Sequence, residues 1–408
     1  MTLQKSDHVI VVGAGLAGWR TCEELRRHGF GGQLTLIGEE SEPPYDRPPL
    51  SKQVLSGKWP LTHAVLATSE KLAAVDVDLR LSVTAQHLDV ARTSVTLSDA
   101  SVVEGTHVVV ATGTRARRLP WYDSRHYELR THADVSRLLA RIESLQEGDV
   151  VAVVGGGFIG AEVATALKAR ELHPIVLEAA ARPLFNVLGE SVSQWLGHLA
   201  GDAGVELRTN QRLVGTDFSY PNGDADVLFE DGSTLRARAV VMGVGAQANV
   251  EWLASSGLKI SNGVVVDAHL WAAENVAAVG DVASFPWRDG SMVRIEHWQV
   301  AADHAASLAL YWTRGIEPAL LVPYFWSDQY GKKIQMLGHP RPDDDVIRVK
   351  ETQEGQWLAL YSHDGVVTGA VALNQPRALM LSKGLLEKVT TMGEALELAP
   401  WAATIRPA

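Results

Sequence analysis

The sequence predicts an α/β fold in which two similar parallel-sheet units precede a smaller α+β region. The chain has 408 residues, enough for two to three domains of ordinary size. Two glycine-rich segments about 140 residues apart share the spacing G-x-G-x-x-G, formed by Gly13, Gly15 and Gly18 and then by Gly155, Gly157 and Gly160. From about residue 324, short strand patterns alternate with turns, which indicates a separate final region.

The first unit is expected to run strand, glycine turn, helix, strand. Residues His8–Val12 form an apolar run, Trp19–Arg27 show a helical pattern, and the apolar run Leu34–Gly38 ends at the acidic Glu39. Further strands are expected at Leu79–Ser82, at Ser94–Leu97 and at Val108–Val110, the last leading into the small-residue turn of Ala111, Thr112 and Gly113.

The second unit repeats this order after a charged helix at Ala133–Leu145. Its elements are the strand Val150–Val154, the helix Ala161–Arg170 and the strand Pro174–Leu177, which ends at Glu178. Later strands and a last helix are expected at Val205–Leu207, Asp226–Phe229, Thr234–Ala237, Val240–Met242, Val276–Ala278, Lys333–Leu337, Val346–Val349, Trp357–Tyr361, Val366–Leu373 and Arg377–Leu386.

Glycines at this spacing predict a dinucleotide site in each unit. The first glycine makes a tight turn, the second lets the backbone approach a pyrophosphate, and the third lets the helix pack on the strand. The pyrophosphate then faces free N–H groups at the helix N-terminus, and the acidic residue binds ribose hydroxyls. Two such units are typical of flavoproteins that keep one dinucleotide and exchange the other. We therefore expect Rossmann-like domains at residues 1–114 with 247–323 and at 115–246, and a C-terminal domain at 324–408.

Composition argues against several classes of protein. The net charge of −11 disfavours bulk attraction to nucleic acid. Neither an apolar run of about 18 residues nor a secretory signal is present, so a cytoplasmic protein without a membrane span is expected. Cys22 is the single cysteine, which excludes paired-thiol chemistry. The histidines lack metal-ligand spacing, so no metal site is expected.

Further motifs accompany the glycine segments. In chain order they are Pro-Tyr-Asp-Arg47-Pro-Pro-Leu-Ser-Lys52, Ala111-Thr112-Gly113, Val-Gly-Asp281, Glu296-His297-Trp298 and Phe-Trp326-Ser-Asp. With these motifs the chain resembles, over its whole length, the flavin-dependent ferredoxin reductases of bacterial oxygenase systems. It is also similar to apoptosis-inducing factor. The first resemblance implies bound FAD, NADH as the reductant and a two-iron two-sulfur ferredoxin as a transient partner.

The same resemblance implies which residues bind FAD. The expected contacts are Gly13, Gly15, Gly18, Glu39, Arg47, Lys52, Ala85, Ala111, Thr112, Gly113, Arg130, Asp281, His297, Trp298 and Trp326. Asp281 is expected on the ribityl chain, with a helix N-cap as its simpler role. Trp326 is expected beside the isoalloxazine on the side where the ferredoxin docks, although core packing is an alternative for any of the twelve tryptophans.

For NADH, the expected contacts are Gly155, Gly157, Ile159, Gly160, Glu178 and Gly245. The Glu178 carboxylate accepts ribose hydroxyls and repels a 2′-phosphate, and Arg182 follows four residues late, so NADH is preferred over NADPH. The resemblance brings Lys52 and Glu162 together near the reactive nitrogen of the flavin, where a lysine stabilises developing negative charge. It assigns Glu296 to the nicotinamide amide. Taken alone, Glu162 is a first-turn acid that complements a helix dipole.

The predicted function is therefore electron transfer from NADH through FAD to a ferredoxin that supplies an oxygenase. One alternative is an NADH oxidase or a rubredoxin reductase on the same scaffold. A second is a redox-sensing or nucleic-acid-associated protein like apoptosis-inducing factor, which would need a basic surface. Lys332 and Lys333, close to Trp326 in sequence, are a candidate docking patch, with a solvated hairpin turn as the simpler interpretation.

Overall fold

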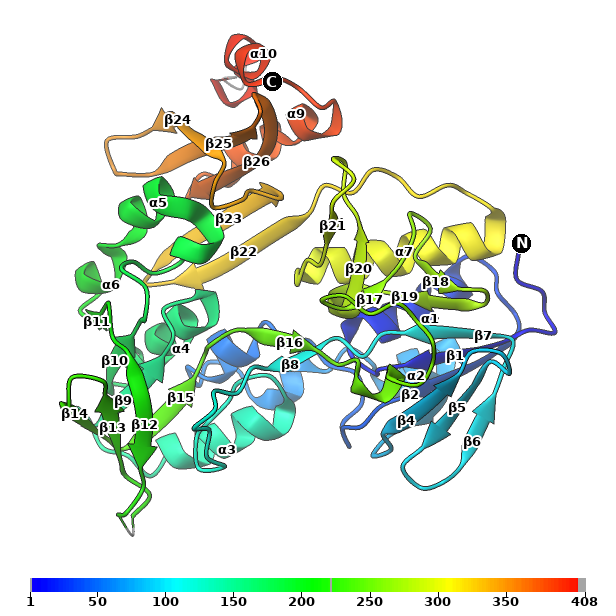
Figure 1. Ribbon diagram of the computed structural model, residues 1–408, viewed down its shortest axis with the longest axis horizontal. Coiled ribbons are helices and arrows are strands. Elements are labelled where there is room, and N and C mark those ends of the chain that lie inside the picture. The colour runs from blue at the N-terminus through cyan, green and yellow to red at the C-terminus, as the bar shows by residue number, and fades with distance from the viewer. Residues whose placement is uncertain (1, 221, 403–408) are drawn as a thin grey trace. The chain divides into compact units, whose positions relative to one another are not determined.

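The computed structural model describes residues 2–220 and 222–402, and the chain separates into two compact units (Figure 1). Unit 1 contains Met1–Asp46, Thr62–Arg115 and Ala246–Leu321. Unit 2 contains Arg47–Leu61, Ala116–Gly245 and Val322–Ala408. Within the described ranges, no helix is both long enough and apolar enough to cross a membrane.

Unit 1 is built on a six-stranded sheet. Its strands are β1 (His8–Val12), β2 (Gln33–Ile37), β3 (Asp78–Arg80), β7 (His107–Val110), β18 (Trp271–Ala273) and β19 (Val276–Ala278). Their order is β18-β19-β7-β1-β2-β3, with β1 parallel to both of its neighbours. Val9, Ile10 and Val11 are fully buried, because a central parallel strand is covered on both faces.

Helices α1 (Leu16–Arg27) and α7 (Trp298–Arg314) pack together in unit 1 (Figure 1). Helix α1 begins three residues before the predicted start and includes Gly18, a weak helix former. A Cβ at Gly18 would overlap the carbonyl oxygen of Gly13, so the glycine is kept for close packing. The other elements are α2 (Ser69–Val75), β4 (Ala85–Asp89), β5 (Ser94–Leu97), β6 (Val102–Glu104), β16 (Ala246–Ala248), β17 (Val264–Val265), β20 (Ala283–Pro286) and β21 (Met292–Val293).

Unit 2 repeats the arrangement on a four-stranded parallel sheet. Its strands are β9 (Val150–Val154), β10 (His173–Leu177), β11 (Glu206–Arg208) and β15 (Ala239–Met242), in the order β11-β10-β9-β15. The backbone hydrogen bonds repeat too: the N–H of Gly13 donates to Ile37 and that of Gly155 to Leu177, both at 2.8 Å. The two glycine segments seen in the sequence therefore form the same hydrogen-bonded turn. Helices α3 (His132–Ile142) and α4 (Phe158–Lys168) and the π-helical turn η1 (Leu50–Val54) complete this part.

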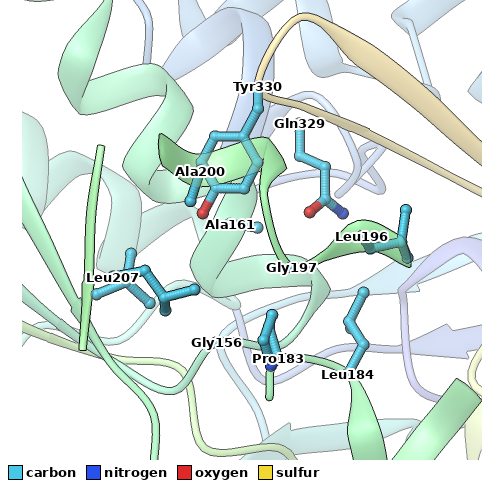
Figure 2. Close-up of a pocket in the computed structure, with 11 residues that line it drawn as sticks. Gly156, Ala161, Pro183, Leu184, Leu196, Gly197, Ala200, Leu207, Gln329 and Tyr330 are labelled. Carbon is cyan, nitrogen blue, oxygen red and sulfur yellow. The ribbon is translucent and has the colours of Figure 1, made fainter. Parts of the chain in front are cut away.

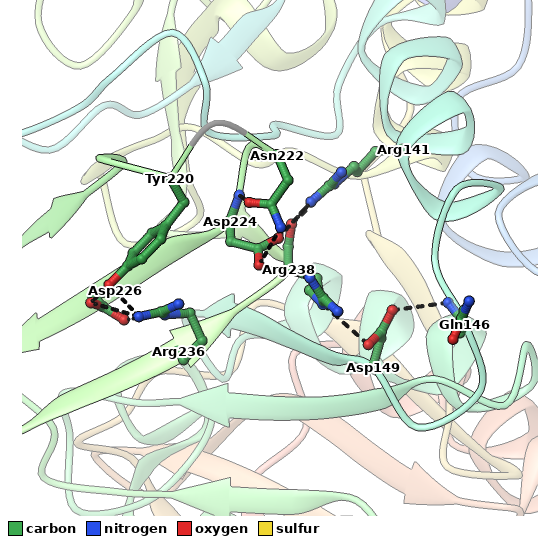
Figure 3. A network of polar contacts seen from close by, with 9 residues as sticks. All are labelled: Arg141, Gln146, Asp149, Tyr220, Asn222, Asp224, Asp226, Arg236 and Arg238. Atoms are coloured by element: carbon green, nitrogen blue, oxygen red, sulfur yellow. Dashed lines mark hydrogen bonds and ion pairs between the residues drawn. The ribbon is translucent and has the colours of Figure 1, made fainter.

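A charged network fixes the antiparallel sheet of unit 2, formed by β12 (Leu213–Asp217), β13 (Ala225–Phe229) and β14 (Thr234–Ala237), as Figure 3 shows. The buried carboxylate of Asp224 pairs with Arg141 at 3.1 Å and with Arg238 at 2.8 Å. Arg238 also reaches Asp149 at 3.2 Å. The Gln146 backbone N–H and then Arg238 lower the pKa of Asp149. The network ties β13 to α3 and to β9, which indicates a structural role.

The C-terminal part of unit 2 is a five-stranded antiparallel sheet in the order β22-β23-β26-β25-β24, formed by β22 (Tyr324–Gln329), β23 (Lys332–Gly338), β24 (Asp345–Glu351), β25 (Trp357–His363) and β26 (Val366–Leu373). The single helix predicted over Arg377–Leu386 is wrong. Two helices, α8 (Pro376–Leu381) and α9 (Lys383–Glu387), meet at Ser382, whose hydroxyl donates to the Ala378 carbonyl oxygen at 3.0 Å. Such back-bonding bends a helix. The remaining elements are α5 (Phe185–Leu196), α6 (Leu199–Asp202), α10 (Met392–Leu398) and β8 (Thr114–Ala116).

Candidate dinucleotide and redox site

In the first glycine turn, close backbone contacts require glycine at Gly13 and Gly18 but not at Gly15. Gly13 has φ +115°, and a Cβ there would overlap the Ala111 carbonyl oxygen. Gly18 packs on Gly13 as described above. Gly15 differs, because its φ of −83° and ψ of −165° suit any residue and no described atom lies within 4 Å of the place for its Cβ. The open space at Gly15 lies at the N-terminus of α1, where a dinucleotide phosphate would approach.

The second glycine turn has the same three properties. Gly155 has φ +102°, and a Cβ there would overlap the carbonyl oxygen of Gly243. A Cβ on Gly160 would overlap the carbonyl oxygen of Gly155. Gly157, with φ −74° and ψ −175°, has no described atom within 4 Å of its Cβ position. Ile159, in the first turn of α4, is exposed. The residues present therefore fit a second dinucleotide phosphate at α4.

The two acidic residues after the second strands are not equivalent. The backbone N–H of Glu178 donates to the Arg208 carbonyl oxygen, and the backbone N–H of Gly38 donates to the Arg80 carbonyl oxygen. Glu178 therefore occupies the position in the second turn that Gly38 occupies in the first, and Glu39 lies one residue beyond that position. The Glu178 carboxylate accepts hydrogen bonds from the N–H groups of Gly156 and Ala180, each at 2.7 Å. Glu39 is exposed. The backbone thus fixes the orientation of the Glu178 carboxylate within the second turn.

Arg182, the nearest arginine after Glu178, is paired with Glu190 on α5. The ion pair is partly exposed, with the two side chains 35% and 57% accessible. A 2′-phosphate on the nucleotide would have to attract Arg182 away from this partner.

The Ala-Thr-Gly turn is linked to the chain crossover that follows Gly245. The Thr112 hydroxyl donates to the Asn249 carbonyl oxygen at 2.8 Å, and the Asn249 side-chain amide donates to the Thr112 carbonyl oxygen at 2.9 Å. Gly113 and Gly245 both have positive φ, at +62° and +98°. No motif in the sequence indicated Asn249 as the partner of Thr112.

Asp281 lies on a short 3₁₀ turn, Gly280–Val282, whose N-cap is Val279. The simpler role proposed for Asp281, an N-cap, is therefore wrong. Thr114 donates to its carboxylate at 3.5 Å. The buried ring of His304 accepts from the Gly280 N–H at 3.2 Å, and burial lowers the pKa of His304 to about 4 despite the opposing effect of Asp281. Nothing in the sequence pattern singled out His304.

Glu296, His297 and Trp298 lie at the entry to α7. Glu296 pairs with Arg294 at 2.6 Å, and the Trp298 indole N–H donates to Asp46 at 2.7 Å. His297 is the N-cap of α7. Ala85, buried at the start of β4, pairs with Leu97 of β5. All of these predicted FAD and nicotinamide contacts lie in unit 1, together with Gly13, Glu39 and Asp281.

Lys52 and Glu162 do meet, inside unit 2. Glu162 is buried on α4, and the Lys52 ammonium lies 2.8 Å from its Oε2. Glu162 is the fifth residue of α4, so the first-turn dipole role considered for it is wrong. Two further donors were not predicted from the sequence: the hydroxyls of Ser51 and Ser327 each lie 2.6 Å from the Glu162 carboxylate. Each serine neighbours a predicted site residue, Lys52 or Trp326.

The other predicted residues of unit 2 lie on loops and on β22. The Arg47 guanidinium donates to the Arg130 carbonyl oxygen at 2.9 Å. Trp326 stacks on Tyr324, with centroids 5.9 Å apart and planes at 20°. Lys332 and Lys333 are adjacent on β23, so their side chains point to opposite faces of the sheet. They therefore do not form one patch, and Lys333 pairs with Asp328 at 3.3 Å.

A small apolar pocket lies beside the second glycine turn (Figure 2). Its lining includes Gly156 and Ala161 from the turn and α4, Gln329 at the end of β22, and Tyr330 directly after that strand. The Tyr330 N–H donates to Thr165 of α4 at 2.8 Å, and burial raises the pKa of the Tyr330 phenol. The pocket lies where the hairpin of β22 and β23 packs on α4, within unit 2.

Comparison with known proteins gives the family. Residues 7–305 match the pyridine nucleotide-disulphide oxidoreductase family, and residues 324–402 match the reductase C-terminal domain. Rhodocoxin reductase of Rhodococcus erythropolis is 33% identical over 93% of this chain and 89% of its own length. Putidaredoxin reductase of Pseudomonas putida is 33% identical over 94% and 92%.

A solved structure agrees over the same length. The reductase in the covalent putidaredoxin reductase–putidaredoxin complex matches with a TM-score of 0.89 and 30% identity, over 98% of this chain and 100% of the other. The two glycine turns, the fold and these similarities agree. The chain belongs to the pyridine nucleotide-disulphide oxidoreductase family and, within it, to the FAD- and NADH-dependent ferredoxin reductases of oxygenase systems.

Proposed function

We propose that the protein takes a hydride from NADH and delivers the electrons singly to a two-iron two-sulfur ferredoxin, which feeds a haem monooxygenase or a ring-hydroxylating dioxygenase. One observation carries the proposal: the chain has two glycine turns with open space at the middle glycine, but only one cysteine. Cys22 is buried, and burial raises its pKa to about 12. The disulfide chemistry in the family's name is therefore closed to this chain, and the electrons must leave to an external acceptor.

FAD would be held by the first glycine turn, with Glu39, Arg47, Ala85, Arg130, Asp281 and the residues around Trp298 and Trp326 as further contacts. When bound, FAD supplies a group that accepts two electrons as a hydride and releases them one at a time. The chain's part is to bind and orient it. The hydrogen bonds around Thr112 and Asn249 and the His304 contact to Gly280 support this, because they fix the loops that carry the predicted contacts.

NADH would bind at the second glycine turn, with Glu178 accepting the ribose hydroxyls. The carboxylate is already aligned by two backbone N–H groups, which favours a neutral hydroxyl over a 2′-phosphate. Glu296 remains our candidate for the nicotinamide amide.

The Lys52–Glu162 pair would support the hydride step electrostatically. The Lys52 side chain is 12% exposed and the Glu162 side chain is 2% exposed, so the pair is held in place before any ligand arrives. A preorganised cation of this kind stabilises negative charge that develops during reaction, without reorganising at that moment. We propose a cytoplasmic location, with the ferredoxin as a transient partner.

The first test is spectroscopic. The purified protein is expected to contain one FAD per chain, which a stoichiometric amount of NADH bleaches under anaerobic conditions, with NADPH much less effective. A folded preparation that takes up no added FAD, or FAD that NADH leaves oxidised, would contradict the proposal.

A further inference from the structure

The carboxylate of Glu162 collects hydrogen-bond donors from two other segments of the chain. Ser51 and Lys52 donate from the π-helical turn η1 to Oε2, at 2.6 and 2.8 Å. Ser327 donates from β22 to Oε1 at 2.6 Å. Among residues 2–220 and 222–402, Oε2 thus has two donors and Oε1 has one, and that one comes from the C-terminal domain.

Ser327 is well suited to hold this carboxylate in one orientation. It is fully buried, and its hydroxyl also accepts from the Gln329 side-chain amide at 3.2 Å. Strand alternation places Ser327 on the face of β22 that meets α4, together with Phe325, whose ring packs against Phe158 at 4.6 Å between centroids. The hydroxyl therefore has a fixed donor direction toward Glu162.

We propose that Ser327 is a positioning residue for the transfer of hydride from NADH, acting through Glu162 on Lys52; this inference rests on the proposed function. The C-terminal domain then contributes to reduction of the flavin as well as to docking of the ferredoxin.

Ser327 can have this role because the two oxygens of the Glu162 carboxylate accept from different donors. Without the Ser327 hydroxyl, Oε1 is a buried charged oxygen that has lost its donor, which is costly. The carboxylate relieves this by rotating until Ser51 or Lys52 is shared between its two oxygens. Lys52 then leaves its preorganised position, and displacements of about 1 Å near a reacting centre can cost about 10²-fold in rate.

The test is anaerobic stopped-flow reduction of the FAD-loaded protein by NADH. Ser327→Ala is expected to lower the limiting rate about tenfold or more, while the apparent Kd for NADH changes less than about twofold. Ser327→Thr, which keeps a hydroxyl, should recover most of the rate. The matched control is Ser382→Ala, which removes another buried hydroxyl of the C-terminal domain, one that donates to the Ala378 carbonyl oxygen of the adjacent helix α8 and lies outside the Glu162 cluster.

A double-mutant cycle separates positioning from general destabilisation. In a Glu162→Gln background, Ser327→Ala should have little further effect on the rate, because both changes act through one carboxylate. Independent, multiplicative losses would overturn the inference, as would a wild-type limiting rate in Ser327→Ala. Ser327→Cys, close in volume and a weak donor, repeats the test should Ser327→Ala fail to fold with FAD. Wild-type protein that NADH does not reduce would instead contradict the proposed function.

Discussion

At the scale of single residues, we expect a preference for NADH over NADPH that rests on charges that are already paired. Glu178 is held by two backbone N–H groups, and Arg182 is held by Glu190. A 2′-phosphate would meet a fixed carboxylate and an arginine engaged elsewhere. We therefore expect the preference for NADH over NADPH to have two causes: repulsion of the 2′-phosphate by Glu178, and the pairing of Arg182 with Glu190 in place of that phosphate.

Removing both parts should relax the preference. Glu178→Gln alone is expected to weaken NADH use and gain little NADPH use, because Arg182 stays paired. Adding Glu190→Gln releases Arg182 and should raise the kcat/KM for NADPH about tenfold further. Steady-state kinetics with both nucleotides check this, with Glu190→Gln alone as the control. Equal constants for NADH and NADPH in the wild-type protein would count against the assignment of Glu178.

His304 is buried beside Gly280 in the first site, and its protonation state affects the stability of the folded protein. Its folded pKa of about 4 lies below the ordinary value of 6.5. As pH falls, the unfolded chain therefore takes up the proton first, and stability present above pH 6.5 is lost as pH falls toward 4.

Between about pH 7.5 and pH 5, this linkage amounts to roughly 2 kcal/mol. His304→Asn keeps an acceptor for the Gly280 N–H but cannot titrate. Thermal midpoints of the FAD-loaded wild-type protein should therefore fall more steeply over this interval than those of the variant. Parallel pH dependences for the two proteins would show that His304 is protonated at its ordinary pKa.

At the scale of elements, each strand–turn–helix unit contains one glycine that no close contact with a described residue requires. Gly13, Gly18, Gly155 and Gly160 are required by close backbone contacts, whereas Gly15 and Gly157 are not. The two units therefore offer matched variants with separate expected effects.

Gly15→Ala should lower FAD content at purification and weaken FAD rebinding about tenfold or more, because its methyl occupies the space for the phosphate. Gly157→Ala should retain FAD and raise the KM for NADH by a similar factor. Gly31→Ala, where a Cβ meets only Lys5 at an ordinary distance, is the control. Absorbance ratios and NADH titrations distinguish the two; full FAD content and wild-type KM in both variants would remove the turns from binding.

The lysines of β23 allow a similar comparison on one strand. Lys333 shares its face of the sheet with Trp326 and Asp328, whereas Lys332 points to the opposite face. We expect Lys333→Glu to raise the KM for a ferredoxin several-fold at low salt, with Lys332→Glu changing it little. Reduction of the flavin by NADH should be unaffected in both. The reverse order of effects would place docking on the other face.

At the scale of the whole molecule, local sequence patterns predicted the parts that depend on neighbouring residues. Most strands of the two parallel sheets, both glycine turns and Glu178 follow from apolar runs and spacing, whereas strands such as β12 and β22 were not predicted. The contacts of Glu162 with Ser51 and Ser327 span 111 and 165 residues, and no periodicity reports such distances. The break at Ser382 was also missed, because a single serine does not interrupt an apolar helical pattern. The meeting of Lys52 with Glu162 was expected only from family resemblance.

Electron transfer from NADH to a ferredoxin is the reaction we propose for this protein. The most direct measurement follows the visible absorbance of two-iron ferredoxins from oxygenase systems, mixed anaerobically with NADH and a catalytic amount of the FAD-loaded protein. We predict that at least one ferredoxin is reduced rapidly, two molecules per NADH, and that no reduction occurs without the protein. Oxidation of NADH with oxygen at a rate that no ferredoxin changes, with every ferredoxin tested remaining oxidised, would contradict electron transfer to a ferredoxin.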